Sequence, residues 1–252
     1  MKVIILAAGQ GTRLRPLTDN KPKCMVELLG KPLIQHQIET LRRNGIDDIH
    51  IATGYLEEKI DFEKTTKHFN PKFASTNMVY TLFCAEQAMH DDDLLISYGD
   101  IVFNDEVLQK VIMSDSDISV VVDQDWKKYW SARMENPLED AETLKLNSEG
   151  AIKELGKKPA SYDEIEGQYI GLIKIKQSMI PKFKEYYRGL DKDKIYDGKD
   201  YENMFMTSFL QMIADNLCPL TPVFIYNGWM EVDAPSDLDF YNFLNYILFL
   251  LV

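Results

Sequence analysis

The chain has 252 residues, long enough for one α/β domain that buries a sizeable core. Its apolar and charged fractions, 45% and 27%, are those of an ordinary globular protein, and it contains no low-complexity segment or solenoid-type repeat. The formal net charge of −12 argues against a nucleic-acid-binding surface, although a local basic cluster can still hold a small anion.

The first half of the chain alternates between strand-like and helix-like segments. Apolar, β-branched runs predict strands at residues 2–8, 47–55, 92–100 and 117–122. Helical patterns occupy residues 31–45, 77–90 and 104–112. Pro32 suits the first turn of the first helix, and Asn77 is a plausible N-cap of the second. This order predicts a Rossmann-like, doubly wound sheet that is mixed but mostly parallel.

The second half of the chain has shorter and less regular segments. Two short strands around a turn are expected at residues 142–156, then a strand at 167–175, a helix at 201–216, a strand at 220–227 and a helix from Pro235. No Gly/Ser/Pro-rich linker separates the halves. We therefore predict a single domain over residues 1–252, with a nucleotide-binding half (1–125) and an acceptor-binding half (126–252).

A glycine-rich loop follows the first predicted strand and carries several positive charges. It is not a dinucleotide fingerprint, because Leu14 stands where the third glycine should be, and it lacks the Gly-Lys-Ser/Thr of a P-loop. Glycines such as Gly9 and Gly11 let backbone amides approach phosphate oxygens closely. Arg13 can grip a phosphate with two donors, and Lys23 is a compact charge. The loop therefore predicts phosphate binding; an ordinary surface loop is the alternative.

Five segments carry a resemblance to a known family, one of which, residues 31–55, looks like the family's first helix and second strand. "AAGQGTRLRPLTDNKPK" (7–23) resembles the signature of the nucleotidyltransferases that activate sugar phosphates and small phosphorylated alcohols. "TNMVYTLFCA" (76–85) is similar to the branch containing the phosphocholine, aminoethylphosphonate and phosphoglutamine cytidylyltransferases. "YGDIVF" (98–103) and "GWMEVDAPSDL" (228–238) resemble the family's metal-binding strand end and its C-terminal segment. The resemblance covers nearly the whole chain and implies a nucleotidyltransferase fold of the GT-A-like kind.

This resemblance implies a role for particular residues. Lys23, Arg13, Asp100 and Asp233 would be catalytic, with the two aspartates holding Mg²⁺. The nucleotide would be bound by Leu6, Ala7, Ala8, Gly9, Gly11, Thr12, Arg13, Lys23, Gly54 and Asn77. For both aspartates a purely structural role, as a helix cap or a loop end, is the alternative.

The acceptor site is less well defined by the sequence. The candidates are Tyr80, Trp130, Lys157, Lys158, Tyr169 and Glu231. Trp130 lies in an aromatic segment whose nearby carboxylates (Glu135, Glu139 and Asp140) could help it to hold an ammonium group. Alternatively, the segment could pack its own aromatic rings together. Many family members carry Glu-Lys-Pro where this chain has Gly-Lys-Lys-Pro, so which of Lys157 and Lys158 acts is open.

The implied activity is CTP-dependent transfer of CMP to a small phosphorylated or phosphonate acceptor, with release of pyrophosphate. The acceptor oxygen is already an anion at neutral pH, so no general base is needed. Such a cytidylyltransferase would serve surface-polysaccharide (capsule) or lipid modification. One alternative is a sugar-1-phosphate nucleotidyltransferase using UTP, dTTP or GTP. An inactive nucleotide-sensing module is the other, and the intact Lys23, Asp100 and Asp233 argue against it.

The remaining signals concern the protein's surroundings. The three cysteines are widely spaced and form neither a disulfide framework nor a zinc pattern, which favours a cytoplasmic location. No signal peptide is expected at the N-terminus. The apolar run at residues 243–252 is about half the length of a membrane span. We expect it to form a terminal helix packed on the core or on a second subunit, without stable membrane insertion, in a monomer or homodimer.

Overall fold

A computed structural model describes the backbone of residues 1–250 and the side chains of residues 1–242. Helix α7 (Pro235–Leu250) begins at the proline predicted to start it. The expectation that the run at residues 243–252 packs on the core or on a second subunit lies outside the described side chains. None of the helices in the described part of the chain combines the length and the apolar character of a membrane span.

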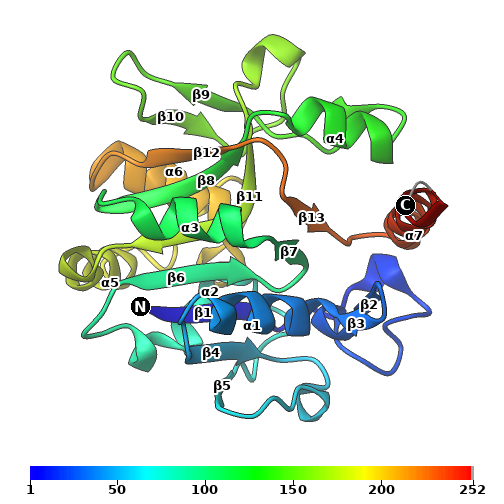
Figure 1. The fold of residues 1–252 in the computed structure, drawn as a ribbon. Helices are drawn as coiled ribbons and strands as arrows, with labels where there is room; N and C mark the ends of the chain where they lie inside the picture. Colours follow the sequence, from blue (N-terminus) through cyan, green and yellow to red (C-terminus); the bar gives the residue numbers. More distant parts are fainter. Residues whose placement is uncertain (251–252) are drawn as a thin grey trace.

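A seven-stranded sheet forms the centre of the molecule (Figure 1), with the strand order β12-β8-β11-β6-β1-β4-β5. Its strands are β1 (Lys2–Ala7), β4 (Asp48–Thr53), β5 (Thr65–Phe69), β6 (Leu94–Tyr98), β8 (Ile118–Asp123), β11 (Gln168–Ile175) and β12 (Thr221–Ile225). β11 runs antiparallel to both of its neighbours, and the other pairings are parallel. The predicted mixed, mostly parallel sheet is confirmed.

Helices cover both faces of this sheet, as a doubly wound fold requires. They are α1 (Leu33–Arg43), α2 (Met78–Cys84), α3 (Asp105–Met113), α5 (Ile180–Arg188) and α6 (Met206–Asn216). The side chains of β1 alternate between two buried clusters. Ile4 packs in the cluster with α2, α5 and α6, and Ile5 packs in the cluster with α1 and α3. Because β1 is buried on both faces, it has the continuous apolar sequence typical of a central parallel strand.

A short antiparallel pair brings the C-terminal part of the chain beside the carboxyl end of β6. The strands are β7 (Ile101–Phe103) and β13 (Trp229–Glu231). Just beyond β13, the N–H of Val232 donates to the carbonyl of Asp100 at 3.1 Å. Asp233 is therefore held next to Asp100 although the two lie far apart in the sequence.

Several smaller elements complete the fold. They are the hairpins β2 (Glu27–Leu28) with β3 (Lys31–Pro32) and β9 (Leu144–Leu146) with β10 (Ile152–Leu155), and helix α4 (Trp126–Arg133). The two short strands predicted within residues 142–156 match β9 and β10.

The helix predicted at residues 201–216 is interrupted. A 3-10 turn, η8 (Tyr201–Asn203), comes first, and α6 begins only at Met206 because Met204 and Phe205 are extended. The carboxylate of Asp200 caps the turn by accepting from the N–H of Asn203. This interruption brings Phe205 to the rim of the site.

Candidate active site

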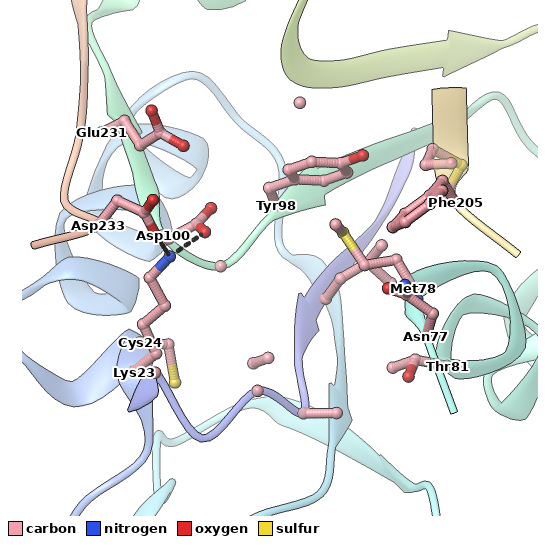
Figure 2. Close-up of a pocket in the computed structure, with 18 of the residues that line it drawn as sticks. Lys23, Cys24, Asn77, Met78, Thr81, Tyr98, Asp100, Phe205, Glu231 and Asp233 are labelled. Carbon is pink, nitrogen blue, oxygen red and sulfur yellow. Dashed lines mark hydrogen bonds and ion pairs between the residues drawn. The ribbon is translucent and has the colours of Figure 1, made fainter. Parts of the chain in front are cut away.

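A cavity of about 510 Å³ lies at the carboxyl ends of β1 and β6, where open α/β sheets bind their ligands. Figure 2 shows Lys23, Asp100, Asp233 and Glu231 on one wall and Asn77, Met78 and Phe205 on the opposite wall, with Tyr98 between them. Many of the residues singled out in the sequence line this cavity: Leu6, Ala7, Ala8, Gly9, Gly11, Thr12, Arg13, Lys23, Asn77, Asp100, Trp130, Tyr169, Glu231 and Asp233.

The glycine-rich loop folds back so that its two ends meet. Gly11 has φ +66°, and a Cβ there would lie 2.9 Å from the Cβ of Lys23, so only glycine fits. The hydroxyl of Thr18 donates to the Gly11 carbonyl at 2.8 Å, and the N–H of Lys23 donates to the Gly9 carbonyl at 3.3 Å. Lys23 is thereby placed directly against the loop, and Arg13 projects from it with an exposed side chain.

The ammonium of Lys23 lies between two carboxylates. Its Nζ donates to Oδ2 of Asp100 and to Oδ1 of Asp233, both at 2.6 Å. The other oxygen of Asp233 pairs with Arg13. Burial alone would lower the pKa of Lys23, but the two carboxylates outweigh that effect and raise its pKa above the ordinary value. Lys23 is therefore a permanent cation in this site.

The two aspartates suit a Mg²⁺ site whose remaining ligands come from the substrate and from water. Oδ1 of Asp100 is buried and has no hydrogen-bond partner among the described residues, as expected of an oxygen reserved for another ligand. No group of three His, Cys, Asp or Glu side chains there is placed to bind a metal by itself. Mg²⁺ commonly needs only one or two carboxylates, because waters and substrate phosphates provide the other ligands.

The part of the cavity that Trp130, Asp140, Glu142 and Tyr169 line combines aromatic and acidic side chains. The rings of Tyr98 and Tyr169 meet edge to face at 5.6 Å, and the Tyr169 hydroxyl is buried without a hydrogen-bond partner among the described residues. The indole N–H of Trp130 donates to Asp140 at 3.1 Å. Burial, reinforced by the charge of Asp140, raises the pKa of Glu142. This wall can therefore receive a cationic group.

Sequence reasoning missed Tyr98 and Glu142 as cavity residues. Tyr98 belongs to the quoted YGDIVF segment, so its position at a strand end was a usable signal. Nothing distinguished Glu142, one of 40 acidic residues in the chain. Its backbone is clamped by the amide side chain of Gln168, whose oxygen accepts from the Glu142 N–H at 2.9 Å. That clamp is a long-range contact with no local signature.

Four of the predicted site residues do not line the cavity. Gly54 lies behind the loop, where a Cβ would come within 2.8 Å of the Cβ of Ala8. Tyr80 lines a second cavity on the other side of α2. Lys157 pairs with Glu154 at 2.9 Å, and Lys158 donates to the Leu138 carbonyl at 2.6 Å.

Two of the alternatives left open by the sequence are also visible. Asn77 caps α2, because its side-chain oxygen accepts from the N–H of Met78 at 2.8 Å while the residue also lines the cavity. The aromatic segment packs its own rings: Trp126 and Trp130 meet at 6.1 Å, and Tyr129 packs on Trp130 at 5.3 Å. Of these rings, Trp130 reaches the cavity.

The fold and this site define a nucleotide-handling enzyme of a known class: residues 2–164 match the nucleotidyl transferase family, and the chain belongs to it. Over 253 aligned residues, the chain is 46% identical to the CTP:phosphoglutamine cytidylyltransferase of Campylobacter jejuni, covering 95% of this chain and 98% of that protein. It is 48% identical over 93 residues to the choline-phosphate cytidylyltransferase of Streptococcus pneumoniae, covering 35% of this chain and 41% of that protein.

Solved structures show the same fold. The CTP:phosphocholine cytidylyltransferase from Streptococcus pneumoniae superposes with a TM-score of 0.68 at 24% identity, covering 98% of both chains. The inositol-1-phosphate CTP transferase from T. maritima gives a TM-score of 0.72 at 20% identity, covering 96% of this chain and 94% of that one. At these identities the likeness concerns the fold alone.

Proposed function

We propose that this chain is a CTP-dependent cytidylyltransferase that joins CMP to a small phosphorylated or phosphonate acceptor and releases pyrophosphate. One observation carries the proposal: Lys23, Asp100 and Asp233 converge within hydrogen-bond distance beside the glycine-rich loop. The full-length similarity to a cytidylyltransferase supports CTP as the donor.

The roles of the side chains follow from where negative charge must be held. Arg13 and the loop amides would bind the β- and γ-phosphates that leave as pyrophosphate. Lys23 would neutralise the charge that grows on the α-phosphate as an acceptor oxygen attacks in line. Mg²⁺, held by Asp100 and Asp233, would supply further neutralisation of the phosphate oxygens when bound. The acceptor oxygen is anionic, so the site needs no general base.

The acceptor side favours a molecule that carries a cationic nitrogen. Trp130 and Tyr169 would supply aromatic surface there, and Asp140, Glu142 and Glu231 would supply negative charge. Both phosphocholine and phosphoglutamine, the acceptors in the names of the two cytidylyltransferase relatives, contain such a nitrogen. A plain sugar phosphate carries no cationic group to pair with the Glu142 carboxylate, which has no partner among the described residues.

One assay tests the proposal: pyrophosphate release from CTP, UTP, dTTP, GTP and ATP, each with phosphocholine, aminoethylphosphonate, phosphoglutamine or glucose 1-phosphate. We expect release with CTP and one of the nitrogen-bearing acceptors. Chelation with EDTA should abolish it, and Mg²⁺ should restore it. Release with UTP, dTTP or GTP and glucose 1-phosphate would support the sugar-nucleotide alternative. No release with any pair would support a nucleotide-sensing module.

The proposal extends to the protein's setting. We propose a cytoplasmic enzyme, because Cys24, Cys84 and Cys218 are all unpaired and the proposed donor, CTP, is an intracellular substrate. Its CDP-linked product would serve capsule or lipid modification. It would act as a monomer or homodimer.

A further inference from the structure

The ammonium of Lys23 occupies the space between the two carboxylates that are proposed to hold Mg²⁺. Its Nζ is 2.6 Å from both Oδ2 of Asp100 and Oδ1 of Asp233, as the dashed lines of Figure 2 show. All three side chains are largely buried, with 16%, 20% and 15% of their surface exposed. Arg13 takes the remaining oxygen of Asp233.

Both oxygens of Asp233 already accept from a cation, Oδ1 from Lys23 and Oδ2 from Arg13. Mg²⁺ binds oxygen at about 2.0–2.1 Å in a strict octahedron, so an ion held by both carboxylates would compete with the ammonium that bridges them. The proposed chemistry also needs Lys23 elsewhere, against the phosphates of the nucleotide. Both requirements are met if the ammonium moves from the carboxylates to the phosphates.

We propose that Lys23 is an internal counterion, which fills the space between Asp100 and Asp233 until Mg²⁺ and a triphosphate bind together. This inference rests on the proposed metal and nucleotide positions. Without a cation, two facing carboxylates in a partly buried site repel each other, and Lys23 removes that repulsion. A lysine suits this exchange because its ammonium is a point charge on a flexible four-carbon stem, whereas arginine is a rigid fork.

The exchange predicts that metal and triphosphate bind cooperatively. When Mg²⁺ binds alone, it must displace the Lys23 ammonium into water. When a triphosphate binds with Mg²⁺, the phosphate oxygens of the nucleotide become new anionic partners for that ammonium. Each ligand therefore favours binding of the other, and by linkage the effect is reciprocal. In the unaltered protein, divalent metal should bind weakly when no nucleotide is present.

Binding of Mn²⁺ in the absence of any nucleotide tests this directly, by titration calorimetry or by the electron paramagnetic resonance signal of free Mn²⁺. We expect Lys23→Met to bind one Mn²⁺ at least about tenfold more tightly than the unaltered protein, a change of the size usual for coupled sites. Lys23→Arg keeps the cation and should bind as weakly as the unaltered protein. Lys21→Met, which removes a charge two residues away and outside the cavity, is the matched control.

Two further measurements make the result decisive. Adding Asp100→Asn to Lys23→Met should abolish the tighter Mn²⁺ binding, and this result would place the ion at these carboxylates. Folding is checked by circular dichroism, and Lys23→Gln repeats the test if the methionine variant does not fold. Folded Lys23 variants that bind Mn²⁺ no more tightly than the unaltered protein would overturn the proposal. Pyrophosphate release by the unaltered protein tests the enzymatic function separately.

Discussion

Lys23 contacts carboxylates that lie 77 and 210 residues further along the chain. At the scale of single residues, the site is a small set of opposed charges, of which Lys23, Asp100 and Asp233 are largely buried. In such surroundings charges interact more strongly than in bulk water, and groups that are already in place need no reorganisation during the reaction.

Replacing Lys23 with alanine should lower kcat by about 10²–10³-fold, the usual loss when one preorganised charge-stabilising donor is removed. Steady-state pyrophosphate release with CTP and the preferred acceptor measures this. Lys21→Ala, a neighbouring lysine outside the cavity, should retain activity. Near-normal turnover of Lys23→Ala would show that its proposed role is wrong.

Glu142 lines the cavity, and its carboxylate has no hydrogen bond or ion pair among the described residues. Burial raises the pKa of this carboxylate, and it lies in the cavity without a charged partner. Its replacement by glutamine should therefore weaken binding of a nitrogen-bearing acceptor. A charge-assisted hydrogen bond contributes about 1.5–3 kcal/mol, so we expect KM for the acceptor to rise by roughly 10–100-fold.

The KM for CTP should stay the same in Glu142→Gln, because that carboxylate lies on the proposed acceptor side. Glu139→Gln is the control, since Glu139 does not line the cavity. An unchanged acceptor KM in Glu142→Gln would show that the carboxylate does not recognise the substrate.

At the scale of elements, an irregular stretch in β11 shapes the part of the cavity that is proposed to bind the acceptor. The pairing of β11 with β8 shifts register between Tyr169 and Ile173. Gly171 lies in this stretch with φ +84°, and a Cβ there would come within 2.6 Å of the ring of Tyr98. The bulge and the missing side chain together leave room for the Tyr98–Tyr169 pair.

Gly171→Ala should lower the free energy of unfolding by about 2–4 kcal/mol, because it combines an unfavourable backbone conformation with a clash. Urea denaturation followed by circular dichroism measures the change. Gly150 separates the two effects, since it has φ +82° but no atom near the position of a Cβ. Gly150→Ala should cost only about 1–2 kcal/mol. Equal losses in the two variants would rule out the clash with Tyr98.

At the scale of the whole molecule, one buried arginine joins three elements of the second half of the chain. Arg133, at the end of α4, pairs with Glu231 of β13 at 3.3 Å and with Asp237 of α7 at 3.0 Å. Only 2% of its side chain is exposed. It helps to hold the segment that carries Asp233, because the other oxygen of Asp237 accepts from the Asp233 N–H at 2.8 Å.

Arg133→Gln should destabilise the protein by about 3–5 kcal/mol, since it leaves two carboxylates in or near the interior without their cation. Thermal and urea denaturation both report this loss. Arg43→Gln is a matched control, because Arg43 pairs with Asp105 at 2.9 Å on the exposed surface. It should cost no more than about 1 kcal/mol. A similar small loss in both variants would contradict the structural role of Arg133.

Elements with strong local patterns could be predicted from the sequence. The apolar run of β1, the helix α1 and the strands β6 and β8 all match their expected segments. The strand β5 and the helix α5 were not anticipated. β5 is half-exposed and mostly polar, so it lacks an apolar alternation, and it forms because it pairs along the edge of β4.

The sequence by itself determined the fold class and the glycine-rich loop, because each depends on a local pattern of residues, whereas the two aspartates were pointed to by a resemblance of two short segments to a known family. Only the tertiary structure decided that Tyr80 and both candidate lysines lie outside the cavity and that Glu142 lies within it. The pairing of β7 with β13, which carries Asp233 to Asp100, was also decided there. Such placements depend on packing between segments remote in sequence, which leaves no periodic or spacing signal in either segment.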